Sequence, residues 1–406
     1  MFSQFTLAQS YSESVQDEKI DQFRKKLNQI SAHGNLSMAI AVGLELGLFE
    51  ALEKAGSDKH PATAMDVARK AGYLKPRYCF EWLCCMACGG LIEVDETGQK
   101  FYIPSEHRDA LVGANAGKEL AFTPMLPMFG AIFKNILELF KNDGPNGLDY
   151  SLYDDFYAKM EILSVTMHRK HLVTEFIPQI KMKEPLKCGI QVLDIGCGGG
   201  FHAIELASHF PNSKFVGIDI GSSAIRGAQE AARRHNLKNV EFICANAAQM
   251  DAQWTDRFDL IFIFDACHDQ CRPDLALQEA YRCLKPDGLF AMVEIRGYGN
   301  CHTDKHILGQ ELSSTLYAVS LFHCLPVGSK TEDALQLGTM WGVETAKLML
   351  NKAGFKHVEV EDVPFFNFNC LYKARKSTIE DESSDGSGPI SPRSNKSVGS
   401  RHGHRH

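Results

Sequence analysis

The sequence predicts an α/β fold: a Rossmann-like sheet of seven strands with an antiparallel terminal strand, preceded by an α+β winged-helix domain and a helical linker or lid. Two observations carry this prediction. From Cys188 onward, apolar runs of strand length alternate with helical patterns, as in sheets whose parallel strands are joined by helices. Nearer the start, three helical patterns precede a short hairpin, which is the element order of a winged helix.

Length and composition indicate an ordinary globular protein. The chain has 406 residues, 44% hydrophobic and 23% charged, which suffices for two or three domains. A net charge of −7 offers no positive field to nucleic acid or to an anionic membrane. The thirteen cysteines are scattered through apolar runs, and no signal-peptide pattern opens the chain. We therefore expect reduced thiols and a cytoplasmic protein without a membrane partner, with the nucleus as the alternative compartment.

The first part of the chain divides into a polar segment over 1–30 and a winged-helix domain over 31–112. Met38–Lys54 is predicted to be one helix, and two shorter helices begin after Thr63 and at Pro76, both with favourable first-turn residues. A hairpin with a glycine in its loop follows.

The charge and shape of this domain favour self-association over DNA binding. Its first helix has almost no polar face, so we expect it to be buried on all sides. Gly43 and Gly47 would let another helix approach, which favours a homodimer; packing within one subunit is the alternative. Residues 30–110 hold 8 Lys and Arg against 11 Asp and Glu, so we expect no nucleic-acid partner. Cys85 and Cys88 have zinc-ligand spacing without a second ligand pair, and we expect no metal.

Residues 113–185 are predicted to form the helical linker or lid. Two helical patterns there are rich in Met and Phe. Such side chains could line an apolar substrate pocket, and core packing explains them equally well.

A glycine-rich turn at Val192–Gly200, V-L-D-I-G-C-G-G-G, follows a predicted strand and opens a helix. The backbone amides of such a turn point at a ligand with no Cβ in the way. A second apolar run ends in Asp219, 23 residues after Gly196. An acid at that position accepts hydrogen bonds from ribose hydroxyls. The unit is therefore predicted to bind a nucleoside.

The glycine spacing decides which nucleoside fits. Dinucleotide turns read G-x-G-x-x-G around a pyrophosphate, whereas Gly196, Gly198 and Gly200 alternate and Asp194 precedes them. A carboxylate at Asp194 would repel a phosphate and would suit an ammonium group. S-adenosylmethionine carries a ribose, an adenine, a sulfonium and an α-amino group, and no phosphate. It is the predicted cofactor.

The sheet-forming domain is predicted to cover 186–375. Further strands are expected at Val240–Cys244, Phe258–Phe264 and Leu289–Ile295, and a closing strand pair gives the antiparallel strand. From 376 to 406 the composition turns to Ser, Gly, Pro and charge, which predicts a disordered tail.

Three motifs carry a family resemblance: D-I-G-C-G-G-G from Asp194, F-D-A-C-H-D from Phe264 and L-K-P-D-G from Leu284. The chain resembles class I S-adenosylmethionine-dependent methyltransferases, and with its winged helix it is similar to bacterial and animal members related to small-molecule O-methyltransferases. The resemblance implies a set of cofactor-binding residues: Asp194 at the methionine amino group; Gly196, Cys197, Gly198 and Gly200 along the chain and ribose; Asp219 and Ile220 at the ribose; Asn246 and Ala247 at the adenine; and Asp265 near the methionine end. Asn246 departs from the family's usual acid and can accept a hydrogen bond only without charge.

The predicted activity is methyl transfer to a small, apolar organic acceptor. Much of the acceleration in such a reaction comes from alignment in a dry pocket, and a base is needed only if the acceptor loses a proton. His268 is the candidate base and Asp269 the residue that orients it; alternatively, His268 only hydrogen-bonds the backbone. A cofactor-binding interaction protein without transfer activity and a macromolecule methyltransferase remain the alternative functions.

Overall fold

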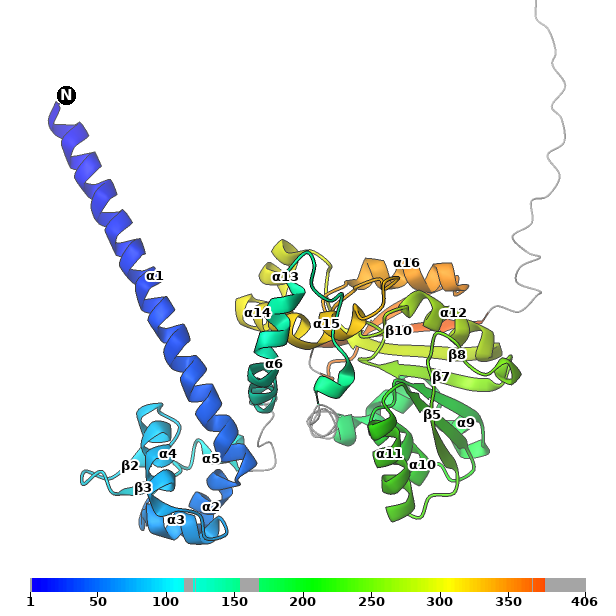
Figure 1. Cartoon of the computed structure of the whole chain (residues 1–406), viewed down its shortest axis with the longest axis horizontal. Coiled ribbons are helices and arrows are strands. Elements are labelled where there is room, and N and C mark those ends of the chain that lie inside the picture. Colours follow the sequence, from blue (N-terminus) through cyan, green and yellow to red (C-terminus); the bar gives the residue numbers. More distant parts are fainter. Residues whose placement is uncertain (1, 113–119, 121, 154–167, 367, 377–406) are drawn as a thin grey trace, which may run out of the picture.

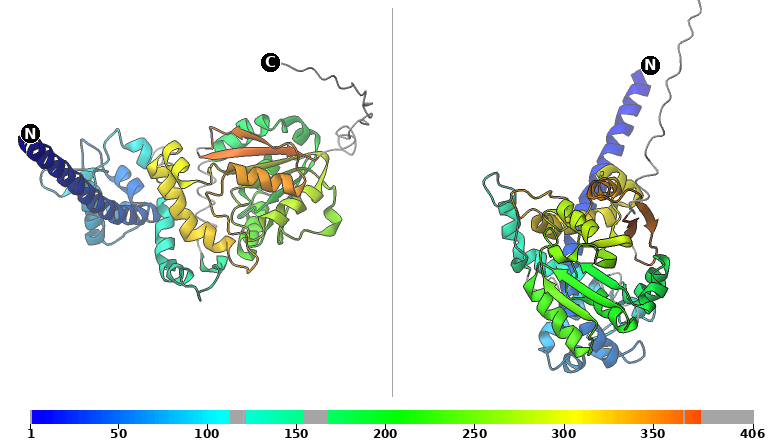
Figure 2. Two further views of the ribbon diagram at one scale, coloured as in Figure 1. Left: turned by 90° about the horizontal axis from the view of Figure 1, so that it is seen from above. Right: turned by 90° about the vertical axis from the view of Figure 1, so that its right-hand side faces the viewer.

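The computed structural model describes residues 2–112, 120, 122–153, 168–366 and 368–376 (Figure 1). A long N-terminal helix and a small α+β unit lie at one end, and the main sheet lies at the other. Helices α6, α13 and α14 lie between them in Figure 1 and in the left view of Figure 2. The predicted tail over 377–406 and parts of the predicted linker, 113–119, 121 and 154–167, lie outside the described residues.

The N-terminal unit is a winged helix, as predicted. Its strands form a small antiparallel sheet in the order β1-β3-β2. Thr63 begins α3 with a capping box, in which Asp66 and Thr63 satisfy each other's backbone N–H groups. The elements are α1 Phe2–Glu45, α2 Leu48–Ala55, β1 Ala62–Thr63, α3 Ala64–Lys70, α4 Pro76–Cys88, β2 Glu93–Val94, β3 Lys100–Tyr102 and α5 Arg108–Leu111.

The single helix predicted over Met38–Lys54 was wrong. Gly47 adopts the left-handed conformation with φ 63°, so α1 ends and α2 starts in a new direction. The break gives α2 an apolar face that fills the core of this unit, where Leu48 is 2% exposed. Within one chain Met38, Val42 and Leu46 are 45%, 49% and 46% exposed, so this helix is not buried on all sides inside the subunit, and its burial against a second copy stays a prediction.

Gly43 has a role inside the chain. A Cβ at this position would lie 2.3 Å from the ring of Trp82 on α4. The Trp82 indole N–H also donates to the Ala39 carbonyl oxygen at 2.9 Å. The glycine therefore admits Trp82, and it gives no support to an approaching second subunit.

Helix α6 packs its apolar residues into a core with the segment 319–327. Phe129 stacks on Phe322 with ring centroids 5.2 Å apart, and Ile132 and Ile136 are buried in the same cluster. Core packing thus explains Met125 and Phe129, whereas Phe133 and Phe140 are 51% and 72% exposed and are absent from the cavity lining. The connecting elements are η1 Thr123–Met125, α6 Leu126–Leu139, η2 Tyr150–Leu152, η3 Leu172–Phe176, α8 Ile177–Gln179, α9 Lys183–Cys188, α13 Cys301–Ile307, α14 Gln310–Val319, η5 Ser320–Cys324 and α15 Leu325–Gly328.

The main sheet has seven strands in the order β6-β5-β4-β7-β8-β10-β9. Neighbouring strands from β4 to β8 are parallel, and β10 is antiparallel to β8 and β9. The predicted sheet is confirmed; its antiparallel last strand lies one position in from the edge formed by β9. The bounds are β4 Gln191–Ile195, β5 Lys214–Asp219, β6 Val240–Cys244, η4 Ala252–Trp254, β7 Phe258–Phe264, β8 Leu284–Ile295, β9 Glu359–Asp362 and β10 Asn369–Arg375.

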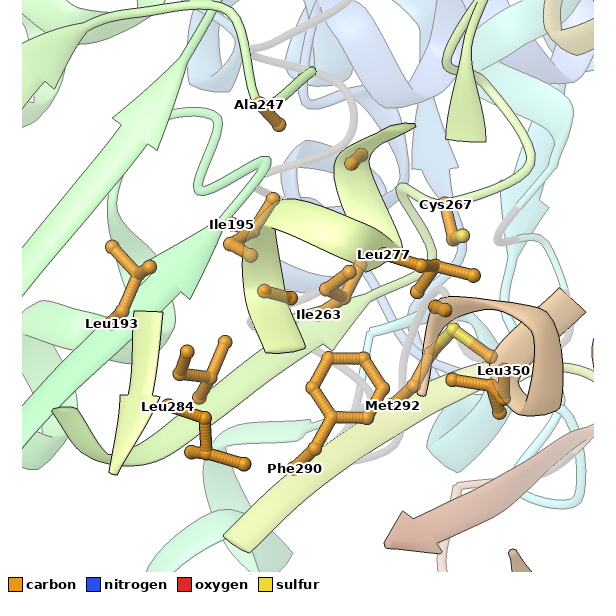
Figure 3. Close-up of a cluster of buried hydrophobic side chains, with 14 of the residues drawn as sticks. Leu193, Ile195, Ala247, Ile263, Cys267, Leu277, Leu284, Phe290, Met292 and Leu350 are labelled. Carbon is orange, nitrogen blue, oxygen red and sulfur yellow. The ribbon is translucent and has the colours of Figure 1, made fainter. Parts of the chain in front are cut away.

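Helices cover both faces of this sheet. On one face α12 Pro273–Cys283 and α16 Val343–Ala353 bury Leu277 and Leu350 against Phe290 and Met292 of β8 (Figure 3). On the other face lie α10 Phe201–His209 and α11 Ser222–Arg234 (Figure 1). The chain winds outward in opposite directions from β4 and β7, so the crevice for a ligand lies at their carboxyl ends.

Among the described residues, none of the helices alone has the length and apolar character needed to cross a membrane. One pair, Gln16–Glu45 with Leu48–Ala55, meets these criteria together but is bent by 70°.

Candidate cofactor site and active site

A cavity of about 720 Å³ lies at the carboxyl ends of the parallel strands. Six of the residues predicted from the sequence line it: Gly196, Asp219, Ile220, Asn246, Ala247 and Asp269. The other six, which are Asp194, Cys197, Gly198, Gly200, Asp265 and His268, are absent from its lining. The loops that follow β4, β5, β6 and β7 therefore all contribute to the wall of this cavity.

The glycine turn after β4 has the conformation that only glycine adopts readily. Gly196, Gly198 and Gly200 have φ values of 72°, 51° and 83°. A Cβ on Gly196 would lie 2.5 Å from the Cβ of Ala266. The turn can thus run close to the β7 loop and beneath the cavity.

Asp219 ties the glycine turn to the loop after β5. Its Oδ2 accepts from the Gly198 N–H at 2.9 Å, and its Oδ1 accepts from the Gly221 N–H at 2.7 Å. These bonds hold the carboxylate at the cavity wall, at the end of the second strand, where the sequence predicts contact with ribose hydroxyls.

Asp194 is a buried acid behind the glycine turn. Burial, with a smaller effect of Asp219, raises its pKa to about 8. Its Oδ2 has no hydrogen-bond partner, which is costly for a buried polar atom. An incoming ammonium group would satisfy this oxygen once the acid ionises, so its chemistry fits the α-ammonium group of S-adenosylmethionine.

The side-chain oxygen of Asn246 accepts one hydrogen bond from the backbone of its own loop. Its Oδ1 accepts from the Ala248 N–H at 2.9 Å. One lone pair of this oxygen remains for an adenine amino group.

The predicted catalytic histidine lies behind the cavity rather than in it. The Nδ1 of His268 is 2.5 Å from Oε2 of Glu294, and its Nε2 is 3.4 Å from Oδ1 of Asp269. Burial opposes a charge on this ring, but the carboxylates of Glu294 and Asp269 outweigh it and raise the pKa of His268 well above its usual value. The two carboxylates therefore favour the charged form of His268, and Asp269 is the member of the pair that lines the cavity.

Asp265 closes β7 in a left-handed conformation with φ 47°. Burial and then Glu294 raise its pKa to about 7. Its Oδ1 accepts from Asn369 at 2.5 Å. Asp265 thus belongs to the buried acidic network under the cavity.

Sequence reasoning missed several residues of this site. Glu294 is fully buried on β8, and an acid inside an otherwise apolar strand is the signal that could have found it. His323 Nδ1 lies 3.8 Å from Asp269 Oδ2, and the Tyr150 hydroxyl lies 3.5 Å from the same oxygen. These two come from distant segments, and no local motif marks them.

Comparison with known proteins identifies both parts of the chain. Residues 186–333 match the model described as "Methyltransferase domain". Residues 34–112 match the model described as "Rv2258c-like winged HTH domain". The chain carries a class I methyltransferase domain behind a winged helix. The sequence prediction of the family and of its cofactor, S-adenosylmethionine, is confirmed.

The methyltransferase also resembles individual proteins. It is 26% identical over 180 residues to the S-adenosyl-L-methionine-dependent Diels-Alderase iccD of Talaromyces variabilis, covering 44% of this chain and 57% of that protein. It is 34% identical over 109 residues to a fatty-acid O-methyltransferase of Mycolicibacterium smegmatis, covering 27% and 38%. The chain thus spans less than two thirds of these relatives.

The fold extends further than this sequence similarity. The structure of human N-acetylserotonin methyltransferase in complex with SAM superimposes with a TM-score of 0.60 at 18% identity, covering 88% of this chain and 98% of that one. At this identity the likeness establishes the fold, including the combination of both domains.

Proposed function

We propose that this methyltransferase transfers the methyl group of S-adenosylmethionine to a small organic acceptor. The observation that carries the proposal is that Asp219, Asn246 and Asp269 line one cavity of about 720 Å³. The first two have the chemistry to bind a ribose and an adenine. The third is a carboxylate in the loop after β7.

The cofactor supplies a methyl group activated on a sulfonium, and the residues of this chain hold it in place. Asp219 would accept from the ribose hydroxyls, and the buried Asp194 Oδ2 would accept from the α-ammonium group. The glycine turn leaves room for the chain between them. This assignment follows the residues predicted from the sequence.

We assign Asp269 as the base and His268 as the residue that positions it, which is the reverse of the roles expected from the sequence. Asp269 lines the cavity, and its Oδ1 is buried 3.4 Å from Nε2 of His268. We assign its carboxylate as the group that takes a proton from an acceptor hydroxyl or amine. The imidazolium of His268, fixed by Glu294, would orient and stabilise the Asp269 carboxylate as a positioning residue.

The lining favours a small and partly apolar acceptor. Tyr150, Tyr153, Leu275 and Val327 contribute aromatic and aliphatic surface beside Asp269. Relatives named for a fatty acid and for N-acetylserotonin are consistent with this class. The net charge of −7 offers no general attraction for nucleic acid. We retain the cytoplasm as the expected compartment on the sequence evidence alone.

Homodimerisation through the N-terminal helix is a further part of the proposal. Ile20, Phe23, Leu27 and Ile30 recur at helical spacing along α1 and are 39–60% exposed. A continuous apolar stripe of this kind marks an interaction surface. The proposed occupant is the same stripe of a second copy, because Gly43 packs against Trp82 and Gly47 breaks the helix within one chain.

One experiment separates the candidate functions. S-adenosylmethionine labelled on its methyl group is incubated with the protein and a fractionated cell extract. Label in small organic molecules supports the proposal, and Asp269→Asn should reduce its rate of incorporation by about 10²–10⁴-fold. Label in protein or nucleic acid would support a macromolecule methyltransferase. Cofactor binding without label in either fraction would favour an interaction protein that only binds the cofactor.

A further inference from the structure

Three side chains with metal-binding atoms meet at the wall of the cavity. His268 and Asp269 lie in the loop between β7 and α12, and Cys324 ends the π-helix η5. One ligand atom from each residue lies within 4.8 Å of the other two. His268 and Cys324 are buried, and Asp269 is partly buried. The fold brings together a nitrogen, an oxygen and a sulfur ligand.

We infer that His268, Asp269 and Cys324 bind a divalent transition-metal ion of the zinc class. Histidine, carboxylate and thiolate together are a ligand set that Zn²⁺ accepts. The 3.4 Å between His268 Nε2 and Asp269 Oδ1 matches the spacing of two ligands around a tetrahedral ion with bonds of about 2.0–2.1 Å. Three protein ligands leave a fourth position for water or for a bound molecule.

Two neighbouring features support ligation. Glu294 accepts from Nδ1 of His268 at 2.5 Å, which is the outer-shell carboxylate that commonly fixes a metal-binding histidine through its other nitrogen. Asp269 Oδ1 is buried without a hydrogen-bond donor. The π-helical turn at Ser320–Cys324 is a rare conformation that occurs often at functional sites.

The charge of the cluster permits the exchange of protons for metal. Ligation requires a His268 ring without a proton on Nε2 and a Cys324 thiolate. The thiolate and the Asp269 carboxylate would together balance the charge of +2 of the ion. The carboxylates of Glu294 and Asp269 keep their charges in both forms.

The inferred site adjoins the acceptor side of the cavity, because Asp269 also lines that cavity. An ion held there could polarise an acceptor hydroxyl as a Lewis acid. Metal binding can be measured without the cofactor, so it can fail independently of methyl transfer. A bound ion would occupy the atoms of His268 and Asp269 that the base assignment uses, so in the metal-bound form the ion would take over activation of the acceptor.

Cobalt(II) is the probe that tests this site, because it replaces zinc and reports on thiolate ligation by absorption. The full-length chain is used with His402, His404 and His406 replaced by Asn, which removes the terminal histidines as a competing site. We expect one Co²⁺ per chain and a thiolate-to-cobalt charge-transfer band in the near ultraviolet. Cys324→Ser should abolish this band. Cys188→Ser, which changes an exposed cysteine at the end of α9, should keep it.

Further variants keep the test decisive. Glu294→Gln should weaken Co²⁺ binding by about 10–100-fold, the usual effect of losing an outer-shell partner. If circular dichroism shows that Cys324→Ser does not fold, Asp269→Asn replaces it, and unchanged Co²⁺ affinity in that variant would refute the site. Absence of the band in the parent chain, or its survival in Cys324→Ser, would also refute it. Calorimetric binding of S-adenosylmethionine by the same samples would show that only the metal proposal has failed.

Discussion

The carboxylate of Glu294 lies 2.5 Å from Nδ1 of His268, and the two side chains are 0% and 2% exposed. With Nδ1 held by Glu294, the other ring nitrogen of His268, Nε2, lies 3.4 Å from Oδ1 of Asp269. The contact with Nδ1 also makes Glu294 the main source of the charge on His268, because burial alone would favour the neutral ring.

Replacing Glu294 by Gln should change the pH dependence of methyl transfer. In the wild type His268 stays charged across neutral pH, since its pKa is raised well above the usual value. Without the Glu294 carboxylate this pKa should fall, so His268 loses its proton and the rate drops as the pH rises through neutrality. The rate of label transfer from pH 6 to 9 measures this. Glu361→Gln, which changes an acid paired with Lys373 on the sheet edge, should keep the wild-type profile.

Replacing Asp194 by Asn should stabilise the cofactor-free protein. The folded-state pKa is about 8 and the unfolded value is about 3.9. Between these values the folded state holds a proton that the unfolded state has released, so stability falls as the pH rises from about 4 to about 8. Asn cannot ionise and avoids this loss. We expect a higher melting temperature than the wild type at pH 7 and a smaller gain at pH 5.

The same substitution should weaken cofactor binding, because the α-ammonium group loses its carboxylate partner. Wild-type binding at pH 7 should release protons as Asp194 ionises, and the variant should not. Calorimetry in two buffers of different ionisation enthalpy detects this difference. A variant that is less stable and binds the cofactor as tightly as the wild type would contradict the assigned role.

Two glycines of α1 test the packing of Trp82, because Gly43 faces its ring and Gly34 faces open space. A Cβ at Gly43 would meet the Trp82 ring at 2.3 Å, whereas a Cβ at Gly34 meets nothing within 4 Å. Gly43→Ala should destabilise the winged helix by about 1–3 kcal/mol through overpacking. Gly34→Ala should stabilise α1 by roughly 0.5–1 kcal/mol through helix propensity. Thermal unfolding followed by circular dichroism compares them, and equal melting temperatures would contradict the packing of Trp82.

The dimer proposal is tested on exposed residues of α1. Leu27 is 48% exposed and Leu48 is 2% exposed, so a charge at Leu27 probes the surface and a charge at Leu48 would disrupt the core. Light scattering on the wild type should give twice the monomer mass. Leu27→Glu should give the monomer mass with an unchanged circular dichroism spectrum. A monomeric wild type would refute the proposal.

The strands and the glycine turn could be predicted because their signals are local. One apolar run of strand length leads into Gly196 and another ends in Asp219. Each run predicts a strand, and the residue that follows or ends it is thereby placed at the carboxyl end of the sheet. The helix break at Gly47 was missed because a glycine in an apolar helical run is compatible with a continuous helix. Its left-handed conformation is favoured by the burial of Leu48 and Phe49 in the core.

The acidic and metal-binding network could not be predicted for a different reason. Cys324 reaches His268 through a π-helical turn, and Glu294 reaches it from within β8, so both contacts depend on the tertiary fold. The sequence placed His268 and Asp269 at the correct end of β7. It gave no information on which of the two side chains faces the cavity.

Calorimetric titration with S-adenosylmethionine tests the central claim most directly. We expect one cofactor molecule per chain, binding of S-adenosylhomocysteine as well, and no response to NAD. Asp219→Ala should lose about 1–3 kcal/mol of binding free energy through its charge-assisted hydrogen bonds, and Asp219→Asn distinguishes loss of charge from disturbance of the Gly198 and Gly221 loops. Absence of heat with S-adenosylmethionine beside a strong response to NAD would contradict the account.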